Sequence, residues 1–199
     1  GFSFLLWLGM VALSTTAIWQ WLPQAFALPL RSVAFSPPAN FHALDFKYGN
    51  AVRLRGYALS SEERLHPNDT VKVTLYWEAL QPIVDNYPVF LQLVDDQNRK
   101  VGQRNTFSGR GMFPTGRWTP GEVMADTILL PIDADAPAPR VYWLIGGLWD
   151  RATGERLPLS GSDPAAVELY KFGEVAVVPE VAHADLPVSA HGLFVEFSR

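Results

Sequence analysis

The sequence predicts an all-β domain, an antiparallel sandwich of immunoglobulin-like or jelly-roll type, preceded by one N-terminal transmembrane helix. Two observations carry this prediction. From residue 41 onward, apolar and polar residues alternate with period two in short runs that end at Gly, Pro, Asn or Asp. Before Arg31 there is no charged residue and no histidine, so the two parts of the chain are suited to different surroundings. The spacing of the strands does not choose between Greek-key arrangements.

The N-terminal segment has the length and composition of a membrane span. Residues 2–21 form an apolar run that would cross about 30 Å of hydrocarbon as a helix. Trp19 and Trp21 are predicted to lie at the membrane interface, and Pro23 would stop the helix. Two alternatives are weaker. A signal peptide would use the small-x-small pattern at residues 25–27 but lacks a positive n-region, and a buried helix of a soluble protein would show a polar stripe.

The whole chain divides into four parts. Residues 1–30 are assigned to the helix and its interface, 31–40 ("RSVAFSPPAN") to a Pro-containing stalk, 41–178 to the sandwich, and 179–199 to a C-terminal extension. Trp77 and Trp143 are predicted to be core residues. The expected strands and turns are a hairpin turning at Gly49 and Asn50, a strand over 71–79, a hairpin turning at 95–98, a type II turn at Pro120 and Gly121 before a strand over 123–130, a strand over 140–149, a short strand ending near Leu159, and one or two more within 166–178.

Four motifs carry a resemblance to a known domain. "LRGYAL", "VTLYWEALQPIVDNYPVFLQLVDD", "PTGRWTPGE" and "GGLWDRATGERLPL" together resemble a β-sandwich at the C-terminal, extracytoplasmic end of bacterial polytopic membrane proteins, including the dolichyl-phosphate-mannose-dependent glycosyltransferase superfamily. The resemblance covers about residues 41–178. Two departures affect loop shape: the loop after Asp95 lacks an expected Gly, and residues 138–140 replace a Gly-containing turn.

The resemblance implies an accessory role. In such proteins the catalytic carboxylates belong to loops of the multi-helix membrane part. The present sequence has one hydrophobic span, so no catalytic residue is carried over to it.

Composition and spacing exclude several kinds of chemistry. A net charge of −4 gives no basic surface for nucleic acid, and the absence of cysteine removes disulfides, thiolate metal sites and cysteine nucleophiles. The histidines His42, His66, His183 and His191 have no zinc spacing, and there is no G-x-S-x-G elbow. Acidic runs at 95–98 and 133–135 could supply oxygen ligands to calcium, but turns are rich in the same residues. We therefore expect no catalytic residue, cofactor or metal.

Two segments are candidate interaction surfaces. In "FPTGRWTPGE", Phe113, Arg117 and Trp118 could stack on a sugar ring or on a partner. Alternatively, Trp118 folds back as a plug over the open end of the sandwich. In "HGLFVEF", the apolar residues Leu193, Val195 and Phe197 could dock as a strand on a neighbouring sheet edge.

These observations predict a membrane-anchored, non-catalytic β-sandwich that acts as an interaction or accessory subunit of a larger membrane assembly. Its expected partners are the lipid bilayer and either a larger membrane protein or another part of its own polypeptide. The β-domain would lie on the extracytoplasmic side, in the periplasm or at the cell surface. One alternative is the C-terminal accessory domain of a polytopic membrane glycosyltransferase. Another is a carbohydrate-binding module, which rests on Trp118 alone.

Overall fold

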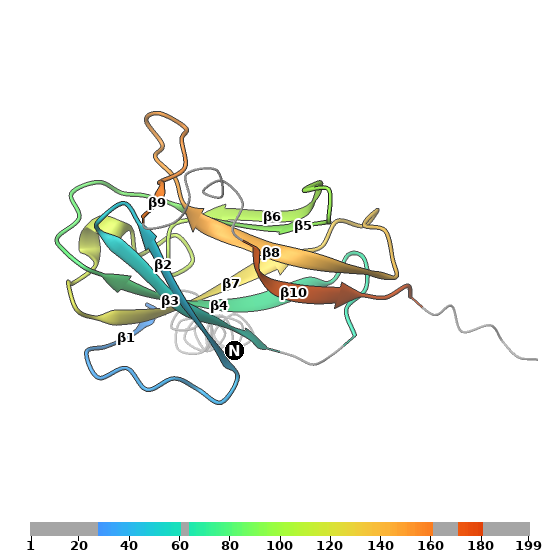
Figure 1. The fold of residues 1–199 in the computed structure, drawn as a ribbon, viewed down its shortest axis with the longest axis horizontal. Helices are drawn as coiled ribbons and strands as arrows, with labels where there is room; N and C mark the ends of the chain where they lie inside the picture. The colour runs from blue at the N-terminus through green and yellow to red at the C-terminus, as the bar shows by residue number, and fades with distance from the viewer. Residues whose placement is uncertain (1–27, 61–63, 161–170, 181–199) are drawn as a thin grey trace, which may run out of the picture.

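The computed structural model describes residues 28–60, 64–160 and 171–180 (Figure 1). These residues form two antiparallel sheets packed face to face, joined by turns and one short 3₁₀ helix, η1 (Thr115–Arg117). The prediction of an all-β antiparallel sandwich is confirmed. The predicted membrane span at 2–21 lies outside the described residues.

The first sheet has the strand order β1-β7-β4-β3-β2-β9 and the second has the order β10-β8-β5-β6. The strands of the first sheet are β1 (Leu30–Ser32), β7 (Val123–Pro131), β4 (Thr70–Ala79), β3 (Val52–Ser60), β2 (Phe41–Tyr48) and β9 (Leu159–Ser160). Those of the second are β10 (Lys171–Val177), β8 (Arg140–Leu148), β5 (Val89–Val94) and β6 (Lys100–Thr106).

The connections between the sheets favour the immunoglobulin-like arrangement over a jelly roll. The chain crosses from β4 to β5, from β6 to β7 and from β7 to β8, so β3, β4 and β7 take the places of strands A, B and E. Strands β10, β8, β5 and β6 then take the places of G, F, C and C′. Near the start of β8 the Tyr142 hydroxyl donates to the carbonyl of Pro137, as a tyrosine corner does at this position.

The core lies between the sheets and is centred on Trp77. Val71, Val73, Leu75 and Trp77 are all buried on one face of β4, as the period-two pattern predicts. Trp77 is fully buried, and the ring centroids of Tyr48 and Trp118 lie 5.7 and 6.1 Å from its own. The largest side chain of the core therefore contacts both a strand of its own sheet and a loop.

The prediction that Trp143 is a core residue is wrong. Its neighbours Tyr142 and Leu144 are fully buried in the core between the sheets, so alternation along β8 directs Trp143 to the outer face. There it is half-buried, and the Lys171 Nζ lies 5.8 Å from the centre of its ring. An apolar run on a central strand does not show which face is inside.

The sandwich begins before the predicted boundary at residue 41. Strand β1 pairs with β7, with Leu30 opposite Ala125 and Ser32 opposite Val123. Phe35 then packs on Phe41 and Tyr76, with ring centroids 5.4 and 5.3 Å away. These contacts make part of the predicted stalk an integral part of the first sheet, because a short pairing of three residues gives no period-two signal in the sequence.

The turns have the predicted chemistry. Gly121 has a φ of +82° and the Glu122 amide donates to the Thr119 carbonyl at 3.1 Å, as in a type II turn. Gly49 has a φ of +54° in the turn between β2 and β3. In the hairpin between β5 and β6, Asn98 takes a φ of +60°, so an Asn fills the left-handed position for which a Gly was expected.

Replacing Trp77 with Ala should lower the free energy of unfolding by about 3–5 kcal/mol, because a large buried aromatic side chain leaves a cavity that its neighbours cannot fill. Urea denaturation of the full chain in detergent measures this difference. Trp143→Ala is the control and should cost less, because Trp143 is half-buried. If both variants lost the same free energy of unfolding, Trp77 and Trp143 would be equally buried, which would contradict the register of β4 and β8 described above.

Candidate functional site

The predicted surface at Phe113, Arg117 and Trp118 is mostly inside the protein. Phe113 and Trp118 are 5% and 7% exposed, whereas Arg117 is exposed. The Trp118 Nε1 donates to the Phe113 carbonyl at 3.2 Å, and its ring contacts Trp77. An open aromatic platform is therefore not present here, and Trp118 closes the end of the sandwich, which was the alternative interpretation of its position in the sequence.

Backbone geometry explains why this loop folds inward. Gly109, Arg110 and Gly111 all have positive φ angles, which turn the chain back sharply, and the Phe113 amide then donates to the Ser108 carbonyl at 2.9 Å. Farther on, the buried Thr115 hydroxyl donates to the Asp85 carbonyl at 2.7 Å and accepts from the Tyr87 amide at 2.8 Å. The two loops at this end of the sandwich are thus held together.

The closed end is joined to the N-terminal strand by Arg31. The Arg31 guanidinium lies 5.0 Å from the centre of the Phe113 ring, and its Nη1 is 3.5 Å from Glu122 Oε2. A cation over an aromatic face and an ion pair to the same side chain hold it from two directions. We call Arg31, Phe113, Trp118 and Glu122 the N-terminal joint, since they connect β1 to the core through Trp77.

A hollow of about 350 Å³ lies beside the joint, at the edge of β7. Asp126 lines it and is 1% exposed. The Gly109 amide donates to Asp126 Oδ1 at 2.8 Å, while Oδ2 and the buried Ser108 hydroxyl have no hydrogen-bond partner among the described residues. Burial raises the pKa of the Asp126 carboxyl against the opposing effects of the Gly109 amide and of the nearby Ser108 side chain. The remaining lining residues are Leu28, Pro29, Leu30, Thr74, Tyr76, Gly109, Arg110, Ala125 and Thr127.

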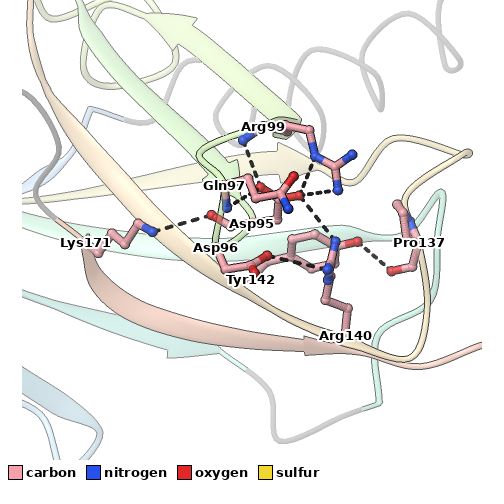
Figure 2. Close-up of polar contacts among 8 residues, drawn as sticks. All are labelled: Asp95, Asp96, Gln97, Arg99, Pro137, Arg140, Tyr142 and Lys171. Atoms are coloured by element: carbon pink, nitrogen blue, oxygen red, sulfur yellow. Dashed lines mark hydrogen bonds and ion pairs between the residues drawn. The ribbon is translucent and has the colours of Figure 1, made fainter.

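A second buried carboxylate, Asp95, lies in the turn after β5 (Figure 2). Its Oδ1 accepts from the amides of Gln97 and Arg99 at 2.9 Å, and its Oδ2 accepts from Arg99 Nε at 2.8 Å and Arg140 Nη1 at 3.3 Å. Burial by itself would raise the pKa of Asp95, but the hydrogen bonds from Arg99 and Gln97 outweigh it and hold the pKa below its ordinary value. The carboxylate therefore fastens the β5–β6 hairpin to β8.

The histidines and acidic residues that were considered as metal ligands do not form a cluster in the described part of the chain. Within residues 28–60, 64–160 and 171–180, no cluster of three or more His, Cys, Asp or Glu side chains could hold a metal ion. His42 stacks on Tyr57 with ring centroids 4.8 Å apart, and His66 Nδ1 is 3.2 Å from Asp69 Oδ2. His183 and His191 lie outside the described residues.

Another hollow, which the sequence did not predict, opens on the outer face of the second sheet. We call it the outer hollow; its volume is about 250 Å³. The strands β5 and β6 contribute three residues to it, and the loop after β8 contributes the others. The lining residues are Phe90, Gln92, Asn105, Trp149, Gly154 and Arg156. Trp149 ends the apolar run over 140–149, in which period-two alternation does not show which way a side chain points.

The remaining predicted site residues fall outside the described part of the chain. These are the interface residues Trp19 and Trp21 and the docking residues Leu193, Val195 and Phe197. Where the structure is described, no helix is both long and apolar enough to cross a bilayer.

Comparison with known proteins gives no assignment. No protein-family model matches the chain, and no curated protein matches it in sequence.

Replacing Asp126 with Asn should stabilise the protein at pH 7. The pKa of Asp126 is raised in the folded protein. The parent protein therefore loses stability as the pH rises from the ordinary Asp pKa, near 4, through the folded-state pKa, because Asp126 must then ionise while buried. Asn keeps an acceptor for the Gly109 amide and carries no charge. We expect a gain of about 1–3 kcal/mol at pH 7, measured by urea denaturation, and a smaller difference at pH 4.

Asp95→Asn is the matched control and should have the opposite effect. Because the pKa of Asp95 is lowered in the folded protein, its ionised side chain stabilises the fold at pH values above the ordinary Asp pKa. This stabilisation is lost as the pH falls through the folded-state pKa. The variant should therefore melt at a lower temperature than the parent at pH 7. If Asp126→Asn were as destabilising as Asp95→Asn, Asp126 would be an ionised, well-paired group, and the interpretation of its surroundings would be wrong.

Proposed function

We propose that the protein is a membrane-anchored, non-catalytic β-sandwich that serves on the extracytoplasmic side as an interaction or accessory subunit of a larger membrane assembly. The observation that supports this proposal most directly is the pairing of β1 with β7. This pairing fastens the domain to the residues that follow the predicted span at 2–21. Only residues 22–29 separate that span from β1, and fully extended they reach less than about 30 Å.

A short tether has a functional consequence. It keeps the domain within reach of neighbours in the membrane plane, so the effective concentration of a partner is high and weak contacts suffice for association. Because β1 is paired with β7, the edge of the first sheet that carries β1 would lie within about 30 Å of the bilayer.

An apolar patch near the tether offers a contact surface. Leu28, Leu30 and Val33 are 51%, 81% and 78% exposed; Leu30 is the first residue of β1, and the other two lie just outside its ends. Exposed apolar groups that gather at one place mark interaction sites more often than isolated ones do. We propose that this patch contacts the extracytoplasmic surface of a neighbouring membrane protein.

Support for a non-catalytic role comes from the use of the ionisable side chains. Asp95 is bound by Arg99 and Arg140, and Glu78 lies 3.7 and 3.5 Å from guanidinium nitrogens of Arg53 and Arg55. Side chains engaged in this way stabilise strands and turns.

A second candidate function is consistent with the same tether and the same apolar patch. If the chain is the C-terminal accessory domain of a polytopic membrane glycosyltransferase, the neighbour that the patch contacts is the rest of the same polypeptide. The sequence motifs that resemble such domains support this alternative. The two candidates differ in whether the partner is covalently attached.

Size-exclusion chromatography of the full chain, extracted from its native membrane in mild detergent, tests the proposal. The protein should elute with a larger membrane protein. Leu30→Glu should shift it toward the size of the free chain while the melting temperature stays unchanged, because the side chain is exposed. Val141→Glu is the matched control: Val141 is 49% exposed on β8 of the other sheet, and its replacement should leave the complex intact. Elution of the parent chain as a lone monomer would contradict the proposal.

A further inference from the structure

The outer hollow combines aromatic and polar groups in a small space. Its floor is formed by Phe90 and Gln92 of β5 and Asn105 of β6, and one wall is formed by Trp149 and Arg156 from the loop after β8. Phe90 is opposite Asn105 in the strand register. At about 250 Å³, the hollow is smaller than the roughly 300–1,000 Å³ of pockets for drug-sized ligands. It suits a single ring of a larger molecule.

The polar groups of the hollow are held in place before any ligand binds. The Arg156 guanidinium lies 4.4 Å from the centre of the Phe90 ring, and its Nη2 donates to Gln92 Oε1 at 3.2 Å. The Gln92 Nε2 in turn donates to Gln103 Oε1 at 3.4 Å. These contacts orient the amide of Gln92 and the guanidinium of Arg156, and fixed groups lose little conformational entropy on binding.

The wall is fixed by the backbone of the loop. Trp149 and Arg156 form an antiparallel bridge, and the Trp149 amide donates to the Pro88 carbonyl at 3.1 Å. Inside the loop, the Asp150 carbonyl accepts from the Gly154 amide and the Asp150 side chain accepts from the Ala152 amide, at 2.8 and 2.7 Å. Gly154 has a φ of +77°, so this position favours glycine and leaves the rim of the hollow open.

Trp149, which lines the hollow, has one unused donor. Its Nε1 is buried and has no hydrogen-bond partner among the described residues. An unpaired buried donor is costly, and a few occur where a ligand or water completes the bonding. Trp149 is half-buried, so its ring also offers an apolar surface.

We propose that the outer hollow binds one ring of a carbohydrate. A sugar ring has an apolar face of C–H groups that stacks on an indole, and hydroxyl groups that both donate and accept hydrogen bonds. The hollow offers the matching groups: the ring of Trp149, the amides of Gln92 and Asn105, and the guanidinium of Arg156. The site differs from the sequence-based carbohydrate hypothesis, which rested on the buried Trp118.

Other ligand classes match the lining less well. A purely apolar ligand would displace water from the amides of Gln92 and Asn105 and from the Arg156 guanidinium without replacing the hydrogen bonds that water makes to them. A hard metal cation is usually held by carboxylates, and the described residues that line the hollow include no Asp or Glu. A nucleic acid would need a basic surface, whereas the whole chain has a net charge of −4.

Saturation-transfer difference NMR with the full chain in detergent micelles tests the proposal. The probes are methyl mannoside, N-acetylglucosamine and glucuronate, added separately. At least one should receive saturation, with a dissociation constant on the order of 1 mM, as a monosaccharide with few contacts allows. Absence of saturation transfer to all three would overturn the proposal.

Three variants locate the bound sugar. Asn105→Ala, at an exposed position, should weaken binding at least about five-fold without changing the melting temperature. Trp149→Phe, which keeps an aromatic ring but removes the Nε1–H, should also weaken it. Trp143→Phe on the same face of the second sheet is the control and should bind as the parent does. Binding that persists in both Asn105→Ala and Trp149→Phe would place the sugar elsewhere. Because these measurements involve no membrane partner, their failure leaves the result of the chromatography experiment unaffected.

Discussion

The contact between Trp77 and Trp118 is the interaction on which the arrangement of the domain depends. Trp77 fills the centre of the core from β4, and Trp118 covers the end of the sandwich from a loop, with ring centroids 6.1 Å apart. The same loop brings Phe113 under the guanidinium of Arg31, and Arg31 belongs to β1. Core packing, closure of the open end and attachment of the N-terminal strand are therefore parts of one continuous set of contacts. Burial of the two aromatic rings contributes to the stability of this set of contacts, and β1 is held to the core through Arg31 and Phe113.

The two buried carboxylates show how the same side chain can have opposite effects on stability. Asp95 accepts hydrogen bonds from two backbone amides and two arginines, so its ionised form is favoured and the hairpin is fixed to β8 (Figure 2). Asp126 accepts one amide hydrogen bond and lies deep in the protein, so its neutral form is favoured. The two carboxylates differ in the number of donors and in depth, because Asp95 lies in a surface turn with charged arginines around it whereas Asp126 does not. Asp126 lies next to the residue with which Leu30 pairs, which places the destabilising group at the point where β1 joins the sheet.

Local sequence patterns predicted the strands well and the orientation of aromatic residues poorly. Period-two alternation identified β4 and its inward-facing Trp77, and the turn residues located the hairpins, because these features depend on neighbours in sequence. The position of Trp143 could not be deduced, since the run around it is apolar on both faces and only the partner strands decide which face is inside. Burial of Phe113 and Trp118 depends on long-range contacts with Trp77 and Arg31. The outer hollow arises from a loop that leans over strands from a different part of the chain, and its residues share no spacing that a sequence pattern could detect.

The pairing of β1 with β7 fixes the start of the described chain to the sandwich, and a cross-link between the two strands tests this pairing. The chain has no cysteine, so Leu30→Cys with Ala125→Cys introduces the only two thiols. Residues opposite each other in an antiparallel pair have Cα atoms about 4.5–5.5 Å apart, within the range for a disulfide. Mild oxidation of the full chain in membranes should form this bond rapidly and leave the melting temperature unchanged or higher. The control, Leu30→Cys with Leu129→Cys, places the second thiol about 13 Å farther along β7 and should remain reduced. Absence of the first cross-link, or equal formation of both, would show that β1 is not fixed to β7.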